Sequence, residues 1–253
     1  MILTLLLKKI ARKLGFGAIP NHAEETYSLD VPASLIEIYK RVKPYTMTSP
    51  ERVFALCEAV KYIHEKNIEG SIVECGVWKG GSMMAVAETL LRSGDTSRNL
   101  YLFDTFEGMS PPTNEDVDIA GVAADSLLEH SDKTKDESVW CCASLEVVKS
   151  AVNSVGYPSD KIHLVKGMVE QTIPLNAPDK IALLRLDTDW YESTKHEMEH
   201  LFPRLAKGGV LIIDDYGHWQ GARKAVDEYF EKNNVKILLN RIDYTGRIAV
   251  KVE

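Results

Sequence analysis

The chain has 253 residues, 45% of them hydrophobic and 26% charged, which is enough to bury the core of one large globular domain. Its formal net charge of -7 argues against nucleic acid as a partner, because affinity for nucleic acid depends on clustered lysine and arginine. The spacing of the four cysteines does not resemble the disulfide framework of a secreted protein. We therefore expect a globular protein of the reducing cytoplasm.

The N-terminal segment joins an apolar run, residues 2–7, to a basic stretch, residues 8–13. The apolar run is too short to span a bilayer, and its charges follow the run instead of preceding it as in a signal peptide. A helix here would place five apolar residues on one face: Leu3, Leu6, Leu7, Ile10 and Leu14. We predict that residues 1–45 form an amphipathic arm with helices, which docks or is exchanged within a homo-oligomer. Weak contact with a membrane surface is the alternative.

Further along the chain, a helical pattern begins near Thr48, with Pro50 in its first turn. From Ser71 onward, short apolar runs alternate with amphipathic segments. This alternation is typical of a parallel sheet with helices on both faces. The strands that we expect are residues 72–76, 100–104, 162–166, 181–187 and 210–215.

The last part of the chain contains two more apolar runs, residues 235–239 and 248–252, separated by a turn signal at residues 244–246. We expect them to form a terminal antiparallel hairpin. A different, irregular stretch with two prolines follows Asp104, and such a stretch cannot form a regular element easily. It predicts an insertion over residues 105–143 that covers a site as a lid.

Carboxylates stand at the ends of four of the five expected strands: Glu74, Asp104, Asp187 and the pair Asp214 and Asp215. Ligands of open α/β sheets bind outside the carboxyl ends of the strands. We therefore expect these five acids to converge on one crevice.

The loop after the first strand is rich in glycine, with Gly76, Gly80 and Gly81, which allow a tight turn and a close approach of ligand. The spacing is not that of the G-x-G-x-x-G dinucleotide fingerprint, which counts against a dehydrogenase. Asp104 ends the next strand, where such folds accept hydrogen bonds from ribose hydroxyls. Together these residues predict a nucleoside-binding site.

Asp187, Asp214 and Asp215 follow two strands that we expect to be neighbours. Three unneutralised carboxylates in one crevice repel each other, so a cation is the natural resolution. Oxygen ligands alone select a hard ion, and an incomplete set that leaves room for water and substrate suits Mg²⁺. The alternative is that these acids cap a helix or face water.

Residues 196–200 read His-Glu-Met-Glu-His and satisfy the H-E-x-x-H signature of zinc proteases. On a helix, however, Met198, Leu201, Phe202 and Leu205 would form the buried stripe and leave both histidines facing solvent. A catalytic zinc ion also needs a third ligand, and none is evident on a matching element. We therefore predict a surface helix here and no zinc site.

The combination of these motifs resembles the macrocin O-methyltransferase family of class I S-adenosylmethionine-dependent methyltransferases, from about Thr46 to the end of the chain. The segments that carry the resemblance are residues 47–52, 74–82, 103–108, 185–194 and 214–217. It implies a Rossmann-like α/β fold with a mainly parallel seven-stranded sheet, a C-terminal antiparallel hairpin and helices on both faces. The methyltransferase domain would span residues 46–253.

The resemblance also implies the cofactors, S-adenosylmethionine and Mg²⁺, and the residues that hold them. Glu74, Gly76 and Gly80 would cradle the methionine part and Asp104 the ribose, while Met168 would line the adenine pocket. Asp187, Asp214 and Asp215 would be the metal ligands. The expected cofactor-binding set is Thr48, Glu74, Gly76, Val77, Trp78, Gly80, Ser82, Asp104, Thr105, Phe106, Ser144 and Met168.

The implied reaction is methyl transfer to a hydroxyl of a small molecule or glycoside. We expect Mg²⁺ to bind two neighbouring substrate oxygens, lower the pKa of one hydroxyl and align it with the methyl group. Related catechol enzymes use a lysine base three residues after the first metal aspartate, but this chain has Trp190 there. Asp187 is therefore the expected base as well as a ligand, with His218 in reserve. A sugar acceptor is favoured, a phenol or catechol is the alternative, and a non-catalytic nucleotide-binding module is a third reading.

Overall fold

The structure is a computed structural model that describes residues 27–135 and 138–253. The chain divides into two units, Met1–Ile36 and Glu37–Glu253, and the site lies in the second. Of the predicted N-terminal arm, residues 1–45, the first 26 residues lie outside the described part of the chain, and these include its five apolar helix positions.

A seven-stranded sheet with the order β3-β2-β1-β4-β5-β7-β6 forms the centre of the second unit. The first five strands are parallel, and β7 runs antiparallel to both β5 and β6. Every residue of β1 and β4 is buried, which explains why the central strands are continuous apolar runs. The strands are β1 (Ser71–Cys75), β2 (Leu100–Asp104), β3 (Ile162–Lys166), β4 (Ile181–Leu186), β5 (Leu205–Ile213), β6 (Asn240–Arg241) and β7 (Arg247–Val250).

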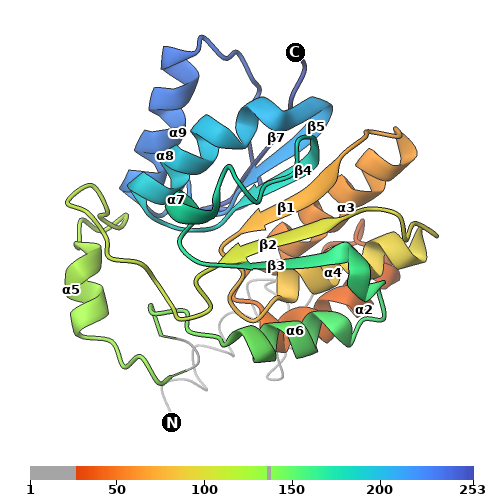
Figure 1. Cartoon of the computed structure of the whole chain (residues 1–253), viewed down its shortest axis with the longest axis horizontal. Coiled ribbons are helices and arrows are strands. Elements are labelled where there is room, and N and C mark those ends of the chain that lie inside the picture. The colour runs from red at the N-terminus through yellow and green to blue at the C-terminus, as the bar shows by residue number, and fades with distance from the viewer. Residues whose placement is uncertain (1–26, 136–137) are drawn as a thin grey trace, which may run out of the picture. The chain divides into compact units, whose positions relative to one another are not determined.

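Helices cover both faces of the sheet, with α3, α4 and α6 on one face and α7, α8 and α9 on the other (Figure 1). None of the helices in the described residues is long and apolar enough to cross a membrane. The helices are α2 (Ala33–Val42), α3 (Pro50–Glu65), α4 (Gly81–Arg92), α5 (Ala124–Glu129), α6 (Leu145–Asn153), α7 (Val169–Thr172), α8 (Tyr191–His200) and α9 (Gln220–Lys232). Single 3-10 turns are η1 (Lys43–Tyr45), η2 (Ser159–Lys161) and η3 (Phe202–Arg204).

The predicted architecture is confirmed, with two differences. The strand expected over residues 210–215 is longer and begins at Leu205. The other difference lies near the end of the chain. Residues 235–239 were expected to form a strand, but the strand that pairs with β7 is β6, only two residues long and further along the chain. The alternating pattern still has a physical basis, because Val235, Ile237 and Leu239 pack against the core beneath α9 while Lys236 and Leu238 are exposed. The segment is therefore extended and half-buried without being part of the sheet.

The expected insertion, residues 105–143, is mostly irregular and contains the short helix α5. Asp116 is its fully buried anchor, since its carboxylate accepts a hydrogen bond from the backbone N–H of Tyr191 (2.6 Å) at the start of α8. A side chain at Gly221 of α9 would collide with that carboxylate. Trp190 adds a second anchor by donating its indole N–H to the carbonyl of Ser110 (2.9 Å). The insertion is thus attached to both helices beside the site.

Candidate active site

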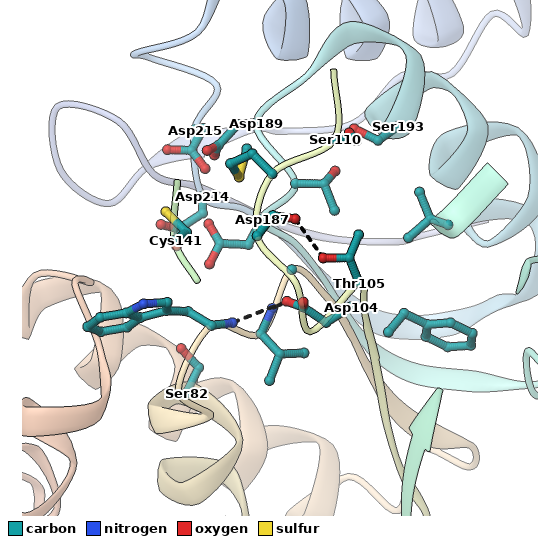
Figure 2. A pocket seen from close by; sticks show the side chains of 18 of the residues that line it. Ser82, Asp104, Thr105, Ser110, Cys141, Asp187, Asp189, Ser193, Asp214 and Asp215 are labelled. Carbon is teal, nitrogen blue, oxygen red and sulfur yellow. Dashed lines mark hydrogen bonds between the residues drawn. The ribbon is translucent and has the colours of Figure 1, made fainter. Parts of the chain in front are cut away.

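A cavity of about 220 Å³ opens at the carboxyl ends of the parallel strands. Figure 2 shows four aspartates, Asp187, Asp189, Asp214 and Asp215, gathered in one part of it, while Asp104 lies in another. The start of α3 and the insertion complete the walls. The predicted site residues that line the cavity are Thr48, Gly76, Val77, Trp78, Ser82, Asp104, Thr105, Met168, Asp187, Asp214 and Asp215.

Five predicted site residues lie outside this lining: Glu74, Gly80, Phe106, Ser144 and His218. Gly80 caps the start of α4 with a left-handed backbone (φ 89°), and the side chain of Ser144 caps α6. Phe106 is buried. His218 lines a separate hollow between α9 and the β6–β7 hairpin.

The carboxylate of Asp104 is held by backbone N–H groups. One oxygen accepts from Val77 (2.7 Å) and Trp78 (3.2 Å), and the other accepts from Phe106 (2.6 Å). No cation forms an ion pair with Asp104 among the described residues. Burial raises the pKa of this carboxyl above its ordinary value, although the three N–H groups oppose that shift. Asp104 therefore joins the loop after β1 to the end of β2 and keeps lone pairs free for a ligand.

Gly76 lies where the loop after β1 (residues 76–80, called the cofactor loop below) meets the end of β4. Its φ is 80°, and a side chain here would collide with the carbonyl oxygen of Asp187. Only glycine combines this backbone conformation with such a close approach. The backbones of the loop after β1 and of the segment after β4 are therefore in direct contact.

Asp187, Asp214 and Asp215 offer carboxylate oxygens that all lie within 4.8 Å of one another. Burial raises the pKa of both Asp187 and Asp215 well above the ordinary value, and neighbouring aspartates add to the shift: Asp214 and Asp215 act on Asp187, and Asp189 and Asp214 act on Asp215. One buried oxygen of Asp215 has no hydrogen-bond partner among the described residues. The cluster therefore carries negative charge that the described side chains do not fully compensate.

Two arginines compensate part of this charge, and sequence reasoning missed both. Arg185 is buried inside β4 and donates to Glu74 and Asp187 (both 2.6 Å) and to Asp214. Arg52 of α3 bonds the other oxygen of Asp214. The only signal for Arg185 was a charged residue within an otherwise apolar strand, and such a residue is normally paired when buried.

Glu74 is fully buried below the cofactor loop, and burial raises its pKa to about 7. Its carboxylate pairs with the buried Arg185, and the residue does not line the cavity. Four of the five acids predicted at the strand ends therefore line the cavity, and Glu74 does not.

The residues after Asp187 were only partly anticipated. Asp189 adopts a left-handed backbone (φ 69°) and lines the cavity, and burial raises its pKa to about 7. Trp190, at the position of the lysine base in catechol enzymes, is buried against Trp219. It positions the insertion and offers no group that could accept a proton.

The H-E-x-x-H segment differs from its predicted orientation. Its histidines are half-buried instead of facing solvent, and His196 shares a hydrogen bond with the carbonyl of Ile173 (2.9 Å). Glu197 between them is fully buried. The predicted stripe used Leu201 and Leu205, but α8 ends at His200, so those two residues do not continue its helical face.

Other lining residues were not predicted as site residues from the sequence. Tyr45 and Met47 come from the segment before α3, Cys141 and Met109 from the insertion, and Glu170 from α7. Cys141 lies near the aspartates in Figure 2.

Comparisons with known proteins agree with this geometry. The chain matches the macrocin-O-methyltransferase (TylF) family over residues 39–250. It is 32% identical over 203 residues to 8-demethyl-8-(2,3-dimethoxy-alpha-L-rhamnosyl)-tetracenomycin-C 4'-O-methyltransferase of Streptomyces olivaceus, covering 80% of this chain and 74% of that protein. It is 29% identical to mycinamicin III 3''-O-methyltransferase of Micromonospora griseorubida, with coverage of 80% and 76%. The solved structure of the O-methyltransferase NovP is also similar, at a TM-score of 0.71, 29% identity and 83% coverage of each chain.

Fold and comparisons together define an S-adenosylmethionine-dependent O-methyltransferase with the class I, Rossmann-like fold. Within that class, the chain belongs to the macrocin-O-methyltransferase (TylF) family.

Proposed function

We propose that this enzyme transfers the methyl group of S-adenosylmethionine to a sugar hydroxyl of a small-molecule glycoside with the help of Mg²⁺. The observation that carries the proposal is the division of one cavity into two acidic ends of different character. The names of two relatives support the acceptor class, since one acts on a rhamnosyl tetracenomycin and the other at the 3'' position of mycinamicin.

The residues present fit a hard divalent ion. Asp187, Asp214 and Asp215 supply only oxygen donors, and one oxygen of Asp215 has no other partner among the described residues. Arg185 and Arg52 neutralise the inner side of the cluster, on Asp214, and leave Asp215 as the acid without an arginine. An ion bound there would act as a Lewis acid that lowers the pKa of a bound substrate hydroxyl.

The cofactor end suits the adenosyl and methionyl parts. Asp104 is oriented by three backbone donors and would accept from ribose hydroxyls. Gly76 and Val77 give a close backbone approach, and Thr48 and Ser82 line the same cavity. We propose Gly80 and Phe106 as supports of this loop, and Ser144 and Met168 as neighbours of the adenine.

For the proton acceptor, the geometry favours Asp189 over the predicted Asp187. One oxygen of Asp187 accepts from the guanidinium of Arg185 at 2.6 Å, which lowers its basicity. Asp189 lines the same cavity and forms no ion pair with the described residues. His218 lies on a separate hollow and remains the third candidate.

Calorimetry with S-adenosylmethionine, with and without Mg²⁺, followed by methyl-transfer assays on glycosides and catechols, tests the proposal. We expect cofactor binding in both conditions and ion-dependent transfer to glycosides. Transfer to catechols alone would show that the acceptor is a phenol and not a sugar. Transfer that EDTA does not affect would contradict the proposed metal dependence.

Two variants separate the candidate bases. Asp189→Asn should abolish methyl transfer while leaving ion binding close to that of the wild type, because Asp189 is not one of the three clustered ligands. Asp187→Asn should weaken ion binding as well. If Asp189→Asn kept full activity, Asp187 would return as the base.

We also propose that the enzyme is a homo-oligomer in which the N-terminal arm is exchanged between subunits. Deletion of residues 1–20 should reduce the mass measured in solution by more than the residues removed. An unchanged subunit number would contradict the role of the arm, and binding of the wild type to anionic vesicles would support the membrane-surface alternative.

A further inference from the structure

The proposed reaction uses no residue of the H-E-x-x-H segment, and Glu197 is the segment's buried carboxyl. Its side chain points into the molecule from α8 and is 0% exposed. A buried carboxyl without a cation is unfavourable, and no described residue forms an ion pair with it. Burying this carboxyl costs free energy, so we expect a polar contact that an apolar residue could not make.

That contact is with the loop after β4. Glu197 Oε1 accepts a hydrogen bond from the hydroxyl of Thr188 at 2.9 Å, and the thiol of Cys75 in β1 is its neighbour in the core. The second oxygen has no partner among the described residues. Burial holds the pKa of this carboxyl well above its ordinary value.

Thr188 stands between two functional aspartates. Asp187 precedes it as a member of the carboxylate cluster, and Asp189 follows it with a left-handed backbone. The carbonyl of Thr188 accepts from the N–H of Trp190 (2.8 Å), which closes a tight turn. A fixed Thr188 side chain therefore restricts the rotation of this turn and the directions in which its neighbours point.

We propose that Glu197 is a positioning residue: through Thr188 it fixes the loop that presents Asp187 and Asp189 to the divalent ion and the acceptor hydroxyl. This inference rests on the proposed function. Partners behind metal ligands generally tune affinity for the ion, and their loss costs about tenfold to hundredfold. The H-E-x-x-H sequence thus serves the metal site through its glutamate, and its histidines need hold no ion.

The test uses four variants and the affinity of the full-length protein for Mn²⁺, measured by electron paramagnetic resonance in the absence of substrate. Glu197→Met and Thr188→Val each remove the hydrogen bond, and Glu197→Gln keeps it, since the glutamine side chain retains a carbonyl oxygen that can accept from the Thr188 hydroxyl. Met198→Leu is the matched control, because it alters a buried residue of the same helix and leaves both partners of the Glu197–Thr188 hydrogen bond in place. Binding of S-adenosylmethionine and thermal unfolding are measured in parallel.

We expect Mn²⁺ affinity to fall about tenfold in Glu197→Met and in Thr188→Val. Glu197→Gln and Met198→Leu should bind the ion as the wild type does, and cofactor affinity should be unchanged throughout. The double variant Glu197→Met/Thr188→Val should be no weaker than either single variant, because both remove one interaction.

Wild-type ion affinity in Thr188→Val, or single effects that multiply in the double variant, would overturn the inference while leaving the proposed function intact. If Glu197→Met does not fold, Thr188→Val and Glu197→Gln still decide the matter. A wild-type protein that binds no divalent ion would instead overturn the proposed metal site and this inference with it.

Discussion

The two ends of the cavity use the same residue type in different electrostatic settings. At the end of β2, Asp104 is satisfied by backbone N–H groups. At the ends of β4 and β5, Asp187, Asp214 and Asp215 lie together, and two arginines compensate them only in part. Amide donors orient a carboxylate without adding a full positive charge, whereas clustered carboxylates create a demand for a cation. On the proposed function, these two settings would let one edge of the sheet bind an uncharged ribose beside a metal ion.

The largest effect is expected from the residue that holds the charged end together. Arg185→Met would leave the buried acids Glu74 and Asp214 without a main partner. Breaking a buried ion pair from one side costs about 3–5 kcal/mol, so the free energy of unfolding should fall by about that amount in urea titrations. Lys180→Met, at an exposed pair with Glu69, is the control and should change stability by less than about 1 kcal/mol. Equal losses would mean that burial does not distinguish the two pairs.

Next in size is the loss of one acid at the metal end. Asp215→Asn removes a carboxylate oxygen that has no other partner among the described residues. Because an ion at this site would stabilise the transition state by several kcal/mol, methyl transfer should fall at least about hundredfold. The affinity for S-adenosylmethionine, measured by calorimetry, should stay within about twofold of the wild type. A parallel loss of cofactor affinity would contradict the separation of the two ends.

The matching change at the cofactor end is Asp104→Asn. It replaces an acceptor oxygen by an amide that cannot accept from the N–H groups of Val77, Trp78 and Phe106 in the same way. Hydrogen bonds to a charged group contribute about 1.5–3 kcal/mol, so cofactor affinity should fall at least about tenfold. Mn²⁺ binding should be unchanged. A variant that lost the ion and kept the cofactor would reverse the assignment of the two ends.

The smallest effect is expected where the insertion meets the metal end. Trp190→Phe keeps most of the buried ring but loses the hydrogen bond to Ser110. One such bond contributes about 1 kcal/mol, so the KM for the acceptor should rise by about fivefold or less. Steady-state kinetics with a glycoside would measure this, with kcat as the internal control. A large fall in kcat would instead give Trp190 a role in the chemistry.

The sequence predicted the sheet and the acids well, because both follow from local patterns. Central strands are continuous apolar runs, and the acids stand where those runs stop. The pairing of Arg185 with Glu74 and Asp214 could not be predicted this way, since it depends on the register between three strands and on burial of a charge. The contact between Arg52 and Asp214 joins residues 162 positions apart and leaves no local trace.

The orientation of α8 shows a second limit. A helical stripe is meaningful only up to the end of the helix, and Leu205 already belongs to β5. Counting it as a helical residue rotated the expected face and placed both histidines toward solvent, although they are half-buried and Glu197 between them is completely buried. Helix ends are the least certain feature of sequence patterns, so charged residues near them are easily assigned to the wrong side.

The buried side chain of Asp116 connects the insertion to the start of helix α8. Its carboxylate is the acceptor for the first N–H of α8, the helix that carries Glu197. Any movement that lifts this part of the insertion exposes an unsatisfied helix end, at a cost of roughly 1–3 kcal/mol. On the proposed function, a movement of the insertion that admitted the acceptor would also remove this hydrogen bond from the start of α8, so opening of the cavity and loosening of the helix behind Thr188 would be thermodynamically coupled.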